Sequence, residues 1–290
     1  MNIIWLGFQQ TLALEIGNEL AQQFVSSLFE QSRGDIKIAG KKYFDIGISW
    51  APVIMHWRNW IVRKALSPPV IVMRDAKPLT VVPIACSWPQ VWLNRKSCGI
   101  PDEISRNFET IMDPLVSSYL EQHHLDHPFT FVDSGCWGTI VKELHSHLGL
   151  KFQPLFFFSH NPWIPGFLNE LGIENKYGEI LNDSFECCFP NAVIRPSSFS
   201  KEKSGLIVPN LKETDYLSEV LGKMVLDGVR IGAASFDDKV QSAADSVQNI
   251  IELSQKAECG EFTGILSSNS PTWSEGDKFL SEWPKELCWT

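Results

Sequence analysis

The chain has 290 residues, a formal net charge of −9, 44% hydrophobic residues and 20% charged residues. This length fits one large α/β domain, or a core domain with a helical annex, and the composition is ordinary for a soluble globular protein with a sizeable core. The acidic balance argues against a general nucleic-acid binder, because phosphate-backbone affinity comes mainly from Lys and Arg. A local basic pocket for a small phosphate remains compatible with it.

No apolar run reaches the roughly 18 residues that a transmembrane helix needs. The N-terminus lacks the basic segment of a signal peptide and carries Glu15 early. We therefore expect a cytoplasmic protein with no membrane partner. The seven cysteines are an odd number without metal-ligand spacing. They predict reduced thiols and no metal site built from side chains.

Helical spacing of apolar residues predicts amphipathic helices over 11–31 and 51–66, and Ser67-Pro68-Pro69 ends the second. The stretch 34–47 between them is turn-rich. A helix start at 76–86 is weakened by Pro78 and Pro83.

Four apolar runs then predict strands: VIVM at 70–73, QVWLN at 90–94, FTFV at 129–132 and FQPLFFFS at 152–159. Helices are predicted over 102–125 and 139–149. Because the runs are continuous and alternate with helices, they predict a mainly parallel sheet flanked by helices, Rossmann-like or phosphoribosyltransferase-like.

Residues 159–172 predict a short helix, a loop containing Pro190 and Pro196 follows, and 212–234 and 237–257 predict two further helices. We expect three parts: an N-terminal helical segment (1–66) packed on the core, an α/β core with phosphate-binding loops (67–160) and a mainly helical C-terminal annex (161–290).

Polar residues follow the predicted strands: Arg74, Asp75, Arg95, Asp133 and Ser134. In open parallel sheets, ligands bind outside the carboxyl ends of the strands. This edge is therefore the predicted site.

The stretch DSGCWGT (133–139) places one acid and two glycines before a predicted helix. Glycines let backbone N–H groups approach an anion, and a helix N-terminus favours negative charge. Thr139 could cap the helix or donate to a phosphate. Asp133 could bind a ribose hydroxyl or a Mg²⁺ carried by phosphates. The alternative is a structural turn in which Asp133 satisfies local N–H groups.

This order of strand, acid, glycine loop, Gly-Thr and helix resembles the diphosphoribosyl-binding motif of type I phosphoribosyltransferases. VIVMRDAKPL and VWLNR upstream add to the similarity. The resemblance implies that Arg74, Asp75 and Lys77 contact pyrophosphate and that Asp133 faces the ribose hydroxyls. It implies a substrate-binding set that also holds Arg95 and the 5-phosphate loop of Ser134, Gly135, Cys136, Gly138 and Thr139. Mg²⁺ would accompany the phosphates.

A second resemblance covers about residues 43–230. IVMRDAKPL, FVDSGCWGTI and FECCFPNAVIRPSSFSKEKSGLIVPNL are similar to an uncharacterised domain found beside haloacid-dehalogenase-like proteins in surface-carbohydrate loci. The chain lacks the DxD nucleophile motif of those proteins, so no phosphatase is predicted.

Three functions follow. The leading one is a phosphoribosyltransferase-like protein that binds a phosphorylated ribose or nucleotide and, if it is an enzyme, transfers or cleaves at the anomeric carbon. The second is a non-catalytic nucleotide-sensing or partner-binding protein, favoured because Ser134 stands where the family usually has a second acid. The third is a hydrolase using Cys136 with His145, His147 or His160. Whether the chain forms a homodimer is left open.

Overall fold

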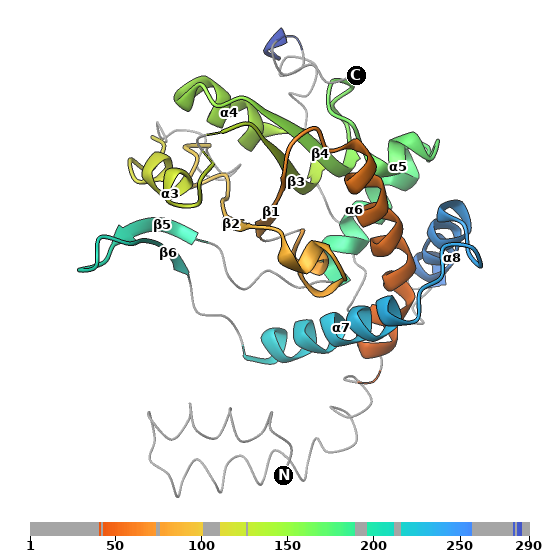
Figure 1. Ribbon diagram of the computed structural model, residues 1–290. Helices are drawn as coiled ribbons and strands as arrows, with labels where there is room; N and C mark the ends of the chain where they lie inside the picture. Colours follow the sequence, from red (N-terminus) through yellow and green to blue (C-terminus); the bar gives the residue numbers. More distant parts are fainter. Residues whose placement is uncertain are drawn as a thin grey trace, which may run out of the picture.

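The computed structural model describes residues 41, 43–73, 76–100, 111–125, 127–188, 196–211, 216–256, 281 and 283–285. Within them a four-stranded parallel sheet is flanked by helices, so the predicted α/β fold class is confirmed (Figure 1). The predicted helix at 11–31 lies outside the described residues. In the described part of the chain, no helix has the length and apolar character needed to cross a membrane.

The sheet has the strand order β2-β1-β3-β4, and each neighbouring pair is parallel. Its strands are β1 (Pro69–Met73), β2 (Gln90–Trp92), β3 (Phe129–Cys136) and β4 (Phe152–Ser159). All eight residues of β4 and the first six of β3 are buried. The continuous apolar runs are therefore explained by a sheet that is covered on both faces.

We call first face the side on which Ile71, Val132 and Leu155 enter the core, and second face the side of Val70, Phe131 and Phe156. The first face is covered by the helix of residues 43–64, η1 (Lys77–Val81), η2 (Ala85–Ser87), α5 (Phe167–Glu170), α6 (Asn175–Cys188), α7 (Tyr216–Ala234) and α8 (Ala243–Lys256). The second face is covered by α3 (Val116–Gln122), α4 (Thr139–Leu148) and the antiparallel hairpin of β5 (Pro196–Lys201) and β6 (Ile207–Leu211).

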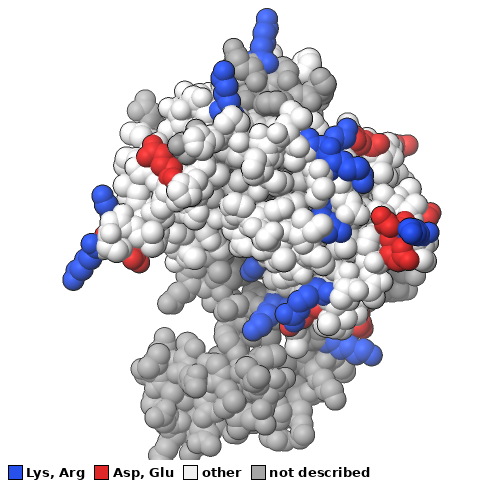
Figure 2. Space-filling view, viewed as in Figure 1, with Lys and Arg blue, Asp and Glu red and all other residues white. Residues whose placement is uncertain are grey.

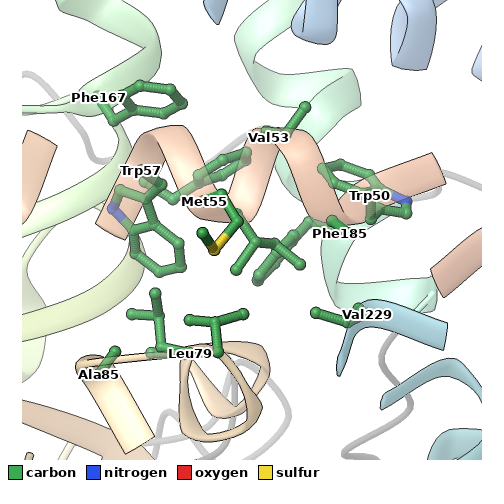
Figure 3. Packing of buried hydrophobic residues seen from close by; sticks show 14 of the residues in the cluster. Trp50, Val53, Met55, Trp57, Leu79, Ala85, Phe167, Phe185 and Val229 are labelled. Atoms are coloured by element: carbon green, nitrogen blue, oxygen red, sulfur yellow. The ribbon is translucent and has the colours of Figure 1, made fainter. Parts of the chain in front are cut away.

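The core of the first face is rich in aromatic side chains. The ring of Trp57, fully buried, lies 5.2 Å from that of Phe157 and 5.8 Å from that of Phe185. Figure 3 shows the helix of residues 43–64 crossing above Leu79 of η1 and near Val229 of α7. Burial of this apolar surface is what fixes the helix on the sheet.

Gln153 on β4 holds the end of the 43–64 helix. Its Oε1 accepts hydrogen bonds from the Leu66 N–H (2.9 Å) and the Thr130 hydroxyl (3.2 Å), and its Nε2 donates to the Lys64 carbonyl (3.1 Å). Backbone groups at a helix end have no partner within the helix. One buried amide therefore satisfies them and ties the helix to the sheet.

The second face is closed by contacts between α3 and the hairpin. Gln122 accepts from the Ile207 N–H (2.7 Å) and donates to the Ile207 carbonyl (3.0 Å), as a neighbouring strand would. Asp113 accepts from the Leu115 N–H at the start of α3 and from the Phe199 N–H of β5, at 2.9 and 2.8 Å. The hairpin is thereby fixed to α3.

Several predicted bounds are wrong. The first described helix covers 43–64, so the predicted turn at 34–47 is helical from 43 onward, and β2 ends at Trp92. Of the predicted helix 102–125, residues 102–110 are not described, and among the described residues the α-helix is Val116–Gln122. Its N-cap is Leu115, whose N–H donates to Asp113 Oδ1. Neither α6 nor the hairpin was predicted.

The composition of α6 explains why it was missed. The segment contains Gly178 and Asn182, which are poor helix formers in isolation. In the fold, a Cβ at position 178 would collide with the ring of Phe158, so glycine is what lets α6 pass close to β4. Tertiary packing thus outweighs a weak local propensity.

Charged side chains of the described residues are scattered over the face drawn in Figure 2. On the face drawn in Figure 2, Lys and Arg stand in small separate groups, some of them beside Asp or Glu.

Candidate functional site

The sheet divides at its carboxyl edge between β1 and β3. Their pairing runs from Pro69–Thr130 to Ile71–Val132. Beyond it, β1 continues beside β2 as far as Met73, whereas β3 continues beside β4 as far as Cys136. We call this point the fork.

The fork coincides with the topological switch point of the sheet. The connection from β1 to β2 crosses the first face, through η1 and η2, and the connection from β2 to β3 crosses the second face, through α3. In open α/β sheets this reversal of strand order is where ligands bind. The topology therefore gives the two predicted loops a common edge.

Asp133 is the first residue of β3 past the fork. Its exposed fraction is 9%, and its Oδ1 accepts the Ser134 N–H at 2.8 Å. It pairs with Phe156, whose side chain enters the core of the second face, and parallel partners point to the same side. Asp133 therefore lies on the second face, beside the end of β1.

The predicted strand end at Val132 is wrong, since β3 extends to Cys136. The long partner β4 supplies pairing as far as Ser159, so Asp133 and Ser134 belong to the strand and are buried. The connection to α4 is reduced to Trp137 and Gly138.

The other residues predicted to touch the phosphates are dispersed. Lys77 opens η1 directly after β1 and is half-buried, and its carbonyl accepts the Thr80 hydroxyl at 2.7 Å. Arg95 lies exposed in the turn after β2, two strands away from Asp133. Arg74 and Asp75 lie outside the described residues.

Both glycines of the DSGCWGT stretch pack against protein. At Gly135, a Cβ would collide with the Phe158 carbonyl oxygen. Gly138 has a φ of 81°, and its Cβ would collide with Ile164 and touch Trp283. Each glycine is thus required by close packing, in addition to any approach to a ligand.

Thr139 is the first residue of α4 and not its N-cap, which is Gly138. The N-cap makes no side-chain hydrogen bond, so the capping role considered for Thr139 is wrong. The first turn of α4 therefore begins without a side-chain acceptor from its N-cap. Such N–H groups favour an anion.

A second group of polar residues lies at the same edge on the first face. Cys136 is partly exposed, packs against the core of that face, and its Sγ accepts a hydrogen bond from Asn182 Nδ2 at 3.2 Å. The peptide bond between Gly135 and Cys136 is cis. The His160 N–H donates to the Cys136 carbonyl at 2.8 Å.

The imidazole of His160 is held from two sides. Its Nε2 lies 3.1 Å from Glu179 Oε1, and its ring stacks on Trp137 with centroids 4.9 Å apart. Glu179 and Asn182 both come from α6, the helix that the sequence did not reveal. Helically spaced Tyr177, Leu181 and Phe185 are the signal that could have found it.

The structure separates the three histidines considered as partners of Cys136. His145 and His147 sit in the last turn of α4, where they contact the Leu150 carbonyl (3.1 Å) and Glu143 (3.2 Å). Because α4 begins at the carboxyl edge and leads away from it, His160 is the one of the three that contacts Cys136, through its backbone N–H.

In the described residues, no group of three or more His, Cys, Asp or Glu could hold a metal ion. The described part of the fork contributes one carboxylate, Asp133. A Mg²⁺ at such a site would have to be held mainly by the phosphates of a ligand.

The chain matches no protein-family model, and a search of curated proteins finds no match either. A fold class of this kind hosts many functions, so the function has to be argued from the site.

Proposed function

We propose that the chain binds a phosphorylated ribose or a nucleotide at the fork, as a phosphoribosyltransferase-like protein. One observation carries the proposal: Asp133 is the first residue past the point where β1 and β3 part, at the switch point of the sheet. A carboxylate there can accept hydrogen bonds from ribose hydroxyls, much as acidic residues do in other open sheets.

Two other groups at the carboxyl edge of the sheet supply attraction for phosphate. Lys77 contributes a positive charge on the loop after β1, and the N-terminus of α4 follows β3 after two residues. A helix N-terminus and a lysine both favour anions. In the family resemblance, Arg74 and Asp75 complete the pyrophosphate site.

If the protein is an enzyme, the reaction is transfer or cleavage at the anomeric carbon. Asp133 then stabilises the positive charge of an oxocarbenium-like transition state, while Arg74 and Lys77 stabilise the leaving pyrophosphate. Mg²⁺ bound to the phosphates would neutralise part of their charge.

A non-catalytic nucleotide-sensing role is the second candidate. It is favoured by Ser134, which is fully buried and stands where the resembled family usually carries a second acid. Asp133 would then contribute to binding without supporting turnover.

A thermal-shift titration tests the proposal. Phosphoribosyl pyrophosphate, common nucleotides and sugar phosphates are titrated, each with and without Mg²⁺. A ligand that binds only the native state stabilises it by about 2.7 kcal/mol at a hundredfold excess over Kd. We expect a shift with at least one phosphorylated ligand, its loss in Asp133→Asn and its weakening in Lys77→Met.

The matched control is Glu252→Gln, which neutralises an exposed carboxylate on α8. Ligand should raise its melting temperature as much as that of the wild type. Absence of a shift with every ligand, or full binding by Asp133→Asn, contradicts a ligand site at the fork. Turnover of a bound phosphoribosyl ligand that is lost in Asp133→Asn distinguishes the enzyme from the sensor.

A further inference from the structure

We propose that Cys136 is a nucleophilic thiol at a second site, on the first face of the sheet, where it accepts acyl groups from activated esters or thioesters. His160 acts as its base and Glu179 positions the imidazole. The inference does not depend on the ligand proposed for the fork, because it rests on a different set of side chains.

The first step is the environment of the sulfur. Asn182 Nδ2 donates a hydrogen bond to Sγ at 3.2 Å, and Cys136 is partly exposed. A donor directed at sulfur favours the thiolate over the thiol. The thiolate is the reactive form, and partial exposure lets a reagent reach it.

The second step is the imidazole. Glu179 Oε1 lies 3.1 Å from His160 Nε2, so the carboxylate accepts the Nε2–H, orients the ring and leaves Nδ1 as the basic nitrogen of the neutral imidazole. Stacking on Trp137, with an interplanar angle of 26°, sets the ring plane. A base oriented by a third group is the arrangement of an activated nucleophile.

The third step is the helix that the thiol and the imidazole share. Glu179 and Asn182 are three residues apart on α6, so they lie on the same side of that helix. Cys136 contacts one of them and His160 the other, and the backbone of His160 donates to the Cys136 carbonyl at 2.8 Å. The thiol and the imidazole therefore each contact a side chain on the same side of α6.

The site is distinct from the fork. Cys136 packs against the core of the first face, whereas Asp133 pairs with Phe156 of the second face. Strand β3 thus carries one reactive group to each side of the sheet.

The chemical step balances within this set. His160 accepts the proton of Cys136, and the sulfur electron pair forms a bond to the acyl carbon. The bond from that carbon to the leaving group breaks, and His160 returns the proton to the leaving group. Water then attacks the thioester, which yields the carboxylic acid and restores the thiol.

The experiment uses 4-nitrophenyl acetate on the native chain, with release of 4-nitrophenolate followed by absorbance and adducts mapped by peptide mass spectrometry. The chain offers two internal references. Cys86 is exposed, and Cys98 is buried, which raises its pKa to about 12. We expect Cys136 to be acetylated about tenfold or more faster than Cys86 at pH 7, and Cys98 not at all.

Variants separate the roles. Cys136→Ser should remove the fast phase, and His160→Phe, which keeps an aromatic ring against Trp137, should slow it about tenfold below pH 8. A reaction of Cys136 no faster than that of Cys86 overturns the proposal, as does an unchanged pH profile in a folded His160→Phe. The comparison of cysteines within the wild type stands even where a variant fails to fold.

Discussion

The two faces of the sheet are built in different ways. The first face gathers segments far apart in the chain, namely the 43–64 helix, η1 and η2, and α5 to α8 (Figure 1). The second face is covered mainly by α3 and α4, the connections directly before and after β3. Coverage by adjacent connections can be predicted locally, whereas coverage by distant segments cannot.

The candidate sites reflect the same difference. Asp133 lies on the second face and was indicated by the strand and loop pattern alone. Cys136 lies on the first face, and its neighbours Asn182 and Glu179 come from α6, more than 40 residues along the chain. A site on the first face is therefore visible only once distant segments have packed.

The largest expected effect is at the core of the first face. Trp57→Ala should lower the free energy of unfolding by about 3–5 kcal/mol, because a fully buried ring between Phe157 and Phe185 is lost. Urea denaturation measures it. Val62→Ala, on the half-exposed side of the same helix, should cost less than about 0.5 kcal/mol. Equal costs would show that the helix is not part of the cooperative core.

A smaller loss is expected at the junction of helix and sheet. Gln153→Leu should cost about 1–3 kcal/mol, since the Leu66 N–H and the Lys64 carbonyl would lose their partner. Denaturation of Gln248→Leu, at an exposed amide on α8, is the control and should stay near the wild-type value. If Gln153→Leu has the same free energy of unfolding as the wild type, water supplies the hydrogen bonds that the amide makes.

On the second face, Gln122→Ala should weaken the attachment of the hairpin by about 1 kcal/mol, because the two hydrogen bonds to Ile207 are lost. Hydrogen exchange at the Ile207 amide should accelerate while the sheet amides keep their protection. The neighbouring exposed Glu121→Ala should leave the Ile207 amide unchanged. Faster exchange throughout the sheet would instead make the hairpin part of the global unit.

The smallest effect concerns pH, with one histidine on each face. Burial lowers the pKa of His56 and of His123 below the usual 6.5. Between the lowered pKa and 6.5 the folded state binds fewer protons than the unfolded chain, so stability falls as the pH drops through this window and levels off below it. In His56→Gln, the free energy of unfolding should fall less steeply with decreasing pH than in the wild type. Urea titrations between about pH 5 and 7 measure it. The same acid loss in His56→Gln and in the wild type would exclude His56 as a contributor.

The sequence by itself determined the parallel sheet, the place of Asp133 directly after the apolar run of its third strand, and the helices α4, α7 and α8. Continuous apolar runs and helical periodicity are local properties, and each of these elements carries one of them. The end of α4 also follows from a local signal, because Gly149 adopts the left-handed conformation that closes the helix.

Tertiary structure alone decided where β3 ends, because β4 supplies its pairing as far as Cys136. It decided that α6 forms, because Gly178 packs on Phe158 despite a weak helical sequence. It also selected His160 over His145 and His147 as the neighbour of Cys136. In each case the energy comes from contacts between segments distant in the chain, which local patterns do not record.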